Sequence, residues 1–133
     1  MKKLMLLIPA GILLSTALIA QNTTWYVDPL TGDDTGVNTG TSALDPFQTV
    51  THAMTIAVSS DTVELMQGTW TDAIETFPIN ITNGVSVIYP GSDPAICLFE
   101  GSATPNACFR LAAVMDDNIE LRGFTVSDFG TGI

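Results

Sequence analysis

The sequence has few basic residues. Four Lys and Arg residues stand against fourteen Asp and Glu residues, which gives a formal net charge of −10 at pH 7. Both lysines, Lys2 and Lys3, lie at the extreme N-terminus. Nucleic acids and anionic membranes are bound through clusters of cations. The composition therefore excludes both as partners, and it disfavours polyuronates unless a metal cation bridges the two negative surfaces.

The N-terminus is typical of a secretory signal peptide over residues 1–20. Lys2 and Lys3 precede an apolar run from Leu4 to Leu14, and small residues follow up to Ala20. The apolar run is shorter than the ~20 residues of a membrane-spanning helix. We expect cleavage after Ala20, or alternatively after Ala17. The mature protein then keeps two Arg and no Lys, a charge of −12, and is secreted or extracellular, with the periplasm or cell surface as variants and no membrane contact.

Cysteine and histidine are scarce as well. One His and two Cys residues, without a Cys-x-x-Cys pair, are too few for a zinc site. An even number of cysteines in an exported protein favours a disulfide, here between Cys97 and Cys108. Alternation with the flanking apolar residues predicts that both side chains point outward. The alternative is two small thiols that never meet.

The remaining chain divides into residues 21–60 and 61–133. In the first part, Trp25–Val27 reads as a strand and Asp28–Asp45 as an Asp- and Gly-rich loop. Apolar residues then recur at helical spacing, which predicts a helix over Pro46–Val58 with Asp45 as its N-cap.

From residue 61 onward the apolar period changes to two. Very short alternating segments are separated by turn residues, and Leu65, Val87 and Phe109 recur every 22 residues. Ile81, Leu98 and Leu121 form a second, looser series. Short strands repeated at a period of ~20 to 25 residues indicate a solenoid in which each coil stacks on the previous one.

Several motifs together carry a family resemblance. In order, they are Tyr26-Val27-Asp28, Gly32-Asp33-Asp34, Asn38-Thr39-Gly40-Thr41, Pro46-Phe47-Gln48-Thr49-Val50, Asp61-Thr62-Val63 and Gly68-Thr69-Trp70. This series resembles the N-terminal domain of unknown function of secreted right-handed parallel β-helix proteins, in the pectate-lyase-like, pectin-lyase-fold superfamily. The chain departs from that pattern at Ser60, where Gly is usual, and at Trp70, where Tyr is usual.

The resemblance implies an all-β fold, a right-handed parallel β-helix with an N-terminal capping α-helix. A solenoid needs such a cap because an uncovered end exposes apolar side chains and free strand edges. Residues 61–133 would then be the first coils of a truncated helix that is open at its C-terminal end. Downstream coils of the same protein are its expected partner there.

Two groups of residues are candidates for ligand binding. The loop residues Asp28, Asp33, Asp34 and Asn38 supply hard oxygen ligands for calcium, although the pattern favours the alternative, a solvated turn whose side chains bond their own backbone. Trp70 and Tyr89 could stack on sugar rings, with packing inside the fold as the alternative.

No complete set of catalytic residues is visible. Asp116 and Asp117 with Asp128 could form a glycosidase carboxylate pair, but the Gly-His-Gly and Arg-x-Lys segments of β-helix hydrolases are missing. Arg110 and Arg122 point outward by alternation and read as surface or ion-pair residues. We therefore predict no catalytic residue in this chain and an extracellular module for carbohydrate binding, adhesion or display, whose partner is a polysaccharide or cell-surface glycan. The alternative is the N-terminal part of a polysaccharide lyase or glycoside hydrolase.

Overall fold

The computed structural model describes residues 22–102, 107–112 and 118–130. The signal peptide predicted for residues 1–20 lies outside them. Within these ranges, no helix is long and apolar enough to cross a membrane.

The regular elements are β1 (Thr24–Val27), α1 (Val50–Ile56), β2 (Thr62–Leu65), β3 (Gly68–Thr71), β4 (Ile79–Asn80), β5 (Ser86–Ile88), the 3-10 turn η1 (Pro94–Ile96), β6 (Cys97–Glu100), β7 (Phe109–Arg110), β8 (Leu121–Arg122) and β9 (Thr125–Ser127).

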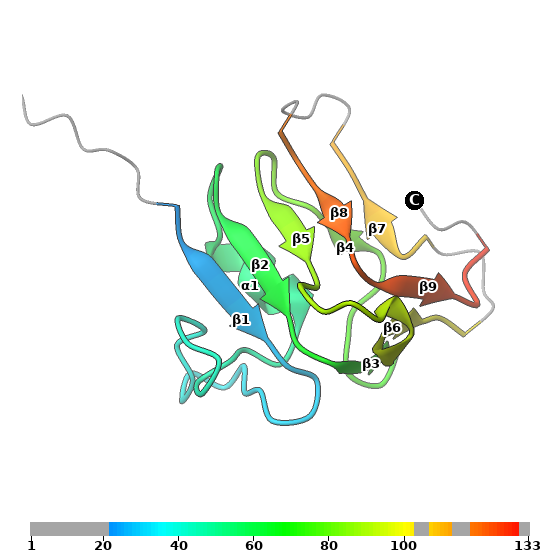
Figure 1. Cartoon of the computed structure of the whole chain (residues 1–133), viewed down its shortest axis with the longest axis horizontal. Coiled ribbons are helices and arrows are strands. Elements are labelled where there is room, and N and C mark those ends of the chain that lie inside the picture. Colours follow the sequence, from blue (N-terminus) through cyan, green and yellow to red (C-terminus); the bar gives the residue numbers. More distant parts are fainter. Residues whose placement is uncertain (1–21, 103–106, 113–117, 131–133) are drawn as a thin grey trace, which may run out of the picture.

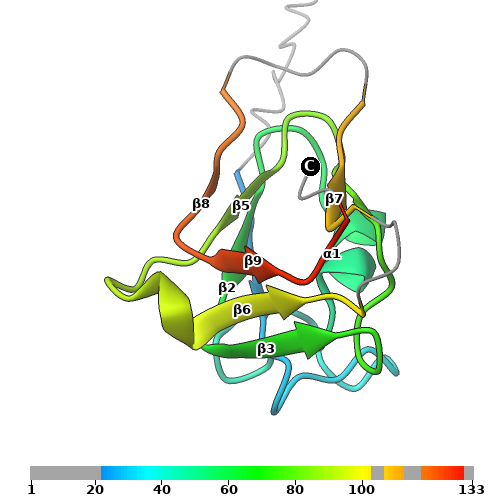
Figure 2. The ribbon, with the colours of Figure 1, turned by 90° about the vertical axis from the view of Figure 1, so that its right-hand side faces the viewer.

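The strands form three sheets in which every strand pair is parallel. The first sheet has the order β1-β2-β5-β8, the second β3-β6-β9 and the third β4-β7. From β2 onward, the chain visits the first, second and third sheet in turn and then returns to the first (Figure 1). Figure 2 shows the second sheet between β5 and β8 on one side and β7 on the other. The predicted parallel, mostly-β fold is confirmed.

Alternation along each strand builds the core between the sheets. In β2, Val63 and Leu65 are fully buried, whereas Thr62 and Glu64 are partly exposed. In the second sheet, Trp70 pairs with Phe99 in register, and their rings stack at a centroid distance of 4.9 Å. Burial of this kind contributes about 25 cal/mol per Å² of apolar surface. The stacked apolar rows are therefore the main source of stability.

The predicted near-constant period of ~20 to 25 residues is wrong. Phe109 does not continue the row of Val87 but pairs with Ile79 in the third sheet. Ile81, Leu98 and Leu121 lie along three different sheets. The loops at the corners differ in length, so the spacing between stacked residues varies. The partners are Val63 and Val87 (24 apart), Phe99 and Val126 (27), Trp70 and Phe99 (29), Ile79 and Phe109 (30), and Val87 and Leu121 (34).

The helix is shorter than predicted. It begins at Val50, and its N-cap is Thr49, whose Oγ1 accepts a hydrogen bond from the His52 N–H at 3.0 Å. Phe47 lies before the helix because it pairs with Val27 in an isolated parallel bridge, which holds that part of the chain extended. The predicted N-cap Asp45 instead accepts hydrogen bonds from the N–H and hydroxyl of Thr39.

The helix lies beside β1 and β4, which are the first strands of two of the sheets. This is the position expected for a helix that covers the N-terminal end of the stack. Its Val50 and Ala53 side chains are buried there. Phe47 stacks against Trp25 at 5.9 Å and meets His52 edge-on at 4.6 Å. His52 therefore packs against Phe47 at the start of the helix.

Glu75, which lies between β3 and β4, forms hydrogen bonds with the start of this helix. Its carboxylate is 3% exposed and accepts hydrogen bonds from the N–H groups of Val50 at 2.7 Å and Thr76 at 2.9 Å. Burial raises the pKa of Glu75, and the hydrogen bonds from Thr51, Thr76 and Val50 partly offset that rise. The carboxylate thus satisfies helix N–H groups that have no partner within the helix.

The loop after β1 closes the outer edge of that strand. The Phe47 N–H donates to the Tyr26 carbonyl at 2.9 Å, and the Asp28 N–H donates to the Phe47 carbonyl at 2.9 Å. The Tyr26 N–H donates to Gly40, whose φ of +70° and contact with the Phe47 ring leave no room for a Cβ. The outward-facing backbone groups of Tyr26 in β1 are consequently paired with the loop and are not available to another strand.

Candidate functional site

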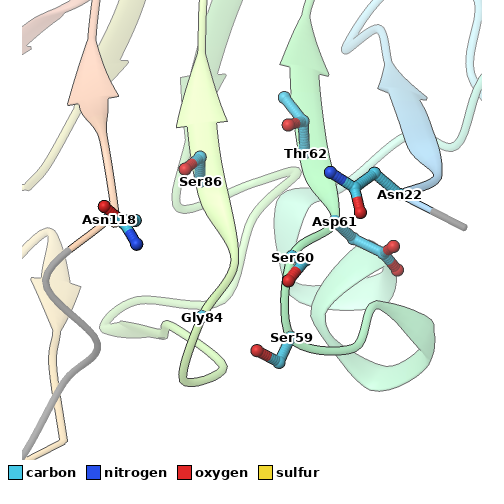
Figure 3. A pocket seen from close by; sticks show the side chains of 8 residues that line it. All are labelled: Asn22, Ser59, Ser60, Asp61, Thr62, Gly84, Ser86 and Asn118. Atoms are coloured by element: carbon cyan, nitrogen blue, oxygen red, sulfur yellow. The ribbon is translucent and has the colours of Figure 1, made fainter. Parts of the chain in front are cut away.

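A polar pocket lies on the outer side of the first sheet, where its strands begin. It has a volume of about 380 Å³. Side-chain hydroxyls and amides dominate its lining, and Figure 3 shows how they are arranged. The lining residues are Asn22, Ser59, Ser60, Asp61, Thr62, Gly84, Ser86 and Asn118.

Strand register places these residues side by side. Thr62 pairs with Thr24 on one side and with Ser86 on the other. Val87 pairs with Leu121, which puts Glu120 next to Ser86, and the Glu120 N–H donates to the Ser86 hydroxyl at 3.0 Å. The other lining residues precede the strands: Asn22 lies before β1, Ser59, Ser60 and Asp61 before β2, Gly84 before β5 and Asn118 before β8. We call Thr62 and Ser86 (the inner row) together with Asn22, Ser60, Gly84 and Asn118 (the outer row) the polar ladder.

The alternation that buries the core residues also places Thr62 and Ser86 on the outer face of the sheet. Val63 and Val87 are fully buried, so their neighbours Thr62 and Ser86 face the other side of the sheet. Neighbouring strands in a sheet are about 4.7–4.9 Å apart. The ladder therefore presents the Thr62 and Ser86 hydroxyls on neighbouring strands, with the amides of Asn22 and Asn118 ahead of β1 and β8 at its two ends.

Asp61 is the one acidic residue among those lining the pocket. Its carboxylate accepts hydrogen bonds from the Thr23 N–H at 2.8 Å, the Trp25 Nε1–H at 2.9 Å and the Val58 N–H at 3.0 Å. Burial pushes the pKa of Asp61 up, but the hydrogen bonds from Val58, Trp25 and Thr23 together lower it below its usual value. In Figure 3 the carboxylate turns toward β1, away from Ser86 and Asn118. Asp61 therefore holds the pocket in shape and leaves its interior to neutral groups.

Two of the residues that line the pocket have positive φ angles. Ser60 has φ +79° and Gly84 has φ +80°, and the Ser60 N–H donates to the Gly84 carbonyl at 2.8 Å. A Cβ on Gly84 would collide with the Ser59 side chain. Glycine is thus required at position 84 by both conformation and space.

The residues predicted to bind calcium each have another role. Asp28 accepts from Leu30 and Thr31, Asp33 from Thr35, and Asp34 from Gln48 and Thr49. The Asn38 amide donates to the Pro46 carbonyl at 2.6 Å. Among the described residues, no group of three or more His, Cys, Asp or Glu side chains is placed to hold a metal ion. The structure does not bring these four residues together as a calcium site, since their oxygens and amide fix the loop itself.

The predicted sugar-stacking residues are not available for stacking. Trp70 is fully buried, and its Nε1–H donates to the Gln48 carbonyl at 3.1 Å. Tyr89 is 9% exposed. That prediction is wrong because both side chains point into the core.

The orientation predicted for the cysteines is also wrong. Cys97 and Cys108 are both fully buried, and both are free cysteines in this structure, without the predicted disulfide. Alternation in β6 runs with Cys97 and Phe99 inward, so Ile96 is left 46% exposed. Burial raises the pKa of the Cys97 thiol to about 12; burial, followed by the negative charge of Glu75, raises that of Cys108. Such thiols are unreactive because the thiolate is the nucleophile.

The remaining charged candidates do not line this pocket, and two of them lie outside the described residues. Arg110 and Arg122 are exposed, as predicted. Arg122 Nε lies 2.7 Å from Glu120 Oε2 in an exposed ion pair, which was one of the roles expected for it. Asp128 is exposed, and Asp116 and Asp117 lie outside the described residues.

Comparison with known proteins gives one match. Residues 30–93 match the model of a family described as "Protein of unknown function (DUF1565)". This domain is known in right-handed β-helix proteins of the pectin-lyase-like type. The family resemblance predicted from the motifs is thereby confirmed. No curated protein and no solved structure matches the chain.

Proposed function

Because residues 30–93 form a DUF1565 domain, we propose that this chain is an extracellular module of a right-handed parallel β-helix. Its task is to bind a neutral carbohydrate through the polar ladder, without catalysing a reaction on its own. The single observation that carries this proposal is the gathering of hydroxyl and amide side chains in one pocket, at or before the starts of four neighbouring strands of one sheet.

The order of the strands supports the β-helix. Three parallel sheets visited in the same order, with β2, β5 and β8 stacked in one of them, are the arrangement that successive coils produce. Connections between parallel strands of one sheet are right-handed in about 98% of cases. The helix α1, which lies beside the first strands of two sheets, is the cap of this stack.

The chemistry of the pocket supports a neutral, hydroxyl-rich ligand. Hydroxyl groups donate and accept hydrogen bonds, and amides offer both a carbonyl and an NH₂ group. Sugar hydroxyls need the same mixture of donors and acceptors. The Asp61 carboxylate already accepts three hydrogen bonds, so it does not favour a cationic ligand inside the pocket. A polyuronate would in addition meet the strong negative charge of the protein, so a neutral glycan fits better.

Binding can be tested with a pair of matched variants. Thr62→Val removes a hydroxyl from the polar ladder with little change in shape, and Thr69→Val makes the same change on β3 of the second sheet. A lost neutral hydrogen bond is worth about 0.5–1.5 kcal/mol, which is roughly a 2- to 12-fold change in Kd. We expect Thr62→Val to weaken the binding of neutral oligosaccharides by this factor and Thr69→Val to leave Kd unchanged.

The assay is calorimetric titration with neutral oligosaccharides, with oligogalacturonates as the charged comparison. Tighter binding of the oligogalacturonates would reverse the proposed ligand class. If the protein binds neither class, or if both variants lose affinity equally, the polar ladder is not the binding site.

The extracellular location rests on the N-terminal sequence. Lys2 and Lys3, the apolar run and the small residues before Gln21 motivate cleavage after Ala20. N-terminal sequencing of the protein recovered from the secreted fraction is expected to begin at Gln21, or at Leu18 if the alternative site is used. Recovery of intact Met1 in that fraction would show that no signal peptide is removed.

A further inference from the structure

Ser60 has a backbone conformation that L-amino acids disfavour. Its φ of +79° lies in the left-handed region, and among the described residues only Asp128, at +60°, is another non-glycine residue with positive φ. A side chain in this region brings Cβ close to the following carbonyl oxygen. Gly84, which forms the other half of the same bend, has the residue type that avoids this strain.

The fold needs only the backbone of Ser60. Its N–H donates to the Gly84 carbonyl at 2.8 Å, and any residue, glycine included, can make that bond. The side chain is exposed and belongs to no apolar cluster. Nothing in the packing therefore compensates for the strain that the side chain introduces.

The left-handed turn determines where the hydroxyl lies. Ser60 lines the pocket between Asn22 and Gly84 in the outer row of the polar ladder. In Figure 3, the Ser59 and Ser60 side chains turn to the side on which Ser86 and Asn118 lie, opposite to the Asp61 carboxylate. The hydroxyl consequently faces the space that a bound ligand would fill.

We propose that Ser60 is a ligand-binding residue that determines specificity, and that the strained turn serves to present its hydroxyl to the ligand. The ligand is the neutral, hydroxyl-rich molecule proposed above, so this inference rests on that function. Residues held in sparsely populated backbone regions cluster at binding sites, where the surrounding structure maintains the strain. The bond to Gly84 and the three hydrogen bonds of the adjacent Asp61 provide that support.

Three variants separate this role from a structural one. Ser60→Gly relieves the strain and removes the hydroxyl, whereas Ser60→Ala removes the hydroxyl and keeps the strain. Asp128→Gly is the matched control, because it relieves positive φ at an exposed residue outside the pocket. Each variant is measured for Tm by thermal unfolding and for Kd toward the neutral oligosaccharide that the unmodified protein binds most tightly.

We expect Ser60→Gly to raise Tm by a few degrees and to weaken binding roughly 2- to 12-fold, the effect of one lost hydrogen bond. Ser60→Ala should weaken binding equally at an unchanged Tm, and Asp128→Gly should leave Kd unchanged. Unaltered Kd values for both Ser60 variants would overturn the role of this residue while leaving the proposed function intact. A lower Tm for Ser60→Gly would contradict the claim that the fold needs only the backbone. Failure of the unmodified protein to bind any neutral oligosaccharide would end the proposed function and this inference together.

Discussion

Replacing Phe99 with alanine is expected to lower the free energy of unfolding by about 3–5 kcal/mol, the range observed for large aromatic side chains in protein cores. Phe99 is fully buried in β6. Its ring lies 4.9 Å from Trp70, 5.1 Å from Phe109 and 5.3 Å from Phe124, measured between ring centroids. Trp70 lies in the neighbouring strand β3, Phe109 in the third sheet and Phe124 in the segment before β9. The cavity left by alanine would therefore remove packing contacts to all three segments.

Leu98 provides the control for this prediction, since it is the preceding residue in the same strand and is only partly buried. Leu98→Ala should cost markedly less than Phe99→Ala when both are measured by urea unfolding at constant m-value. Phe99→Leu, which keeps part of the volume, is the variant to use if Phe99→Ala does not fold. Equal losses for Leu98→Ala and Phe99→Ala would mean that Phe99 does not occupy the centre of the core.

Replacing Asp61 with alanine is expected to cost about 2–4 kcal/mol, because Asp61 serves three partly buried donors, and each of them left without a partner costs less than the ~1–3 kcal/mol of a fully buried donor. Those donors are the N–H groups of Thr23 and Val58 and the indole of Trp25. They connect the start of β1, the end of the helix segment and the start of β2. Asp33→Ala is the control, since Asp33 accepts only from Thr35 within its own turn.

The effect of Asp61→Ala should also depend on pH. Hydrogen bonds lower the pKa of Asp61 in the folded protein below its usual value, so its stabilising contribution is complete above the unfolded-state pKa of about 3.9. It is lost as the pH falls through the lower, folded-state pKa. The stability difference between the two proteins should thus be large at pH 7 and shrink in strong acid. A difference that stays constant down to the acid transition would contradict this role of the carboxylate.

The sequence indicated the type of fold more accurately than its dimensions. Val63 with Leu65, and Val85 with Val87, alternate with polar residues and are all buried, because these strands have one face toward the core. The period was wrong because it matched residues of different sheets, such as Val87 and Phe109. Strands of two to four residues carry too little pattern to show which of them stack when the loops between them differ in length.

Alternation along the sequence predicts the wrong side-chain orientation where the backbone bends. Cys108 and Phe109 are adjacent and both buried, since Cys108 lies in a bend before β7 rather than in the strand. Alternation predicts Cys97 outward only if Ile96 belongs to the same strand, whereas Ile96 ends the turn η1 and the strand begins at Cys97. The sequence leaves Trp70 open to sugar stacking or to packing, and the alternation of β3 places it inward with its neighbours Thr69 and Thr71 outward.

The candidate site was missed for a different reason. Asn22, Thr62 and Ser86 are separated by many residues, and each reads in the sequence as an ordinary outward polar residue. Only the strand register brings them together. One sequence signal of the positive φ was present: Ser60 stands at a position where the family that the chain resembles usually has glycine.

The claim that the polar ladder is a binding surface is tested most directly by locating the bound ligand. Backbone amide NMR spectra of the protein, recorded during titration with the neutral oligosaccharide, report contacts residue by residue. We predict that the signals of Ser60, Thr62, Ser86 and Asn118 shift together and saturate with one Kd, while those of β3 and β6 stay in place. Shifts confined to the second sheet or to the loop of residues 28–45, with the polar ladder unchanged, would contradict the account.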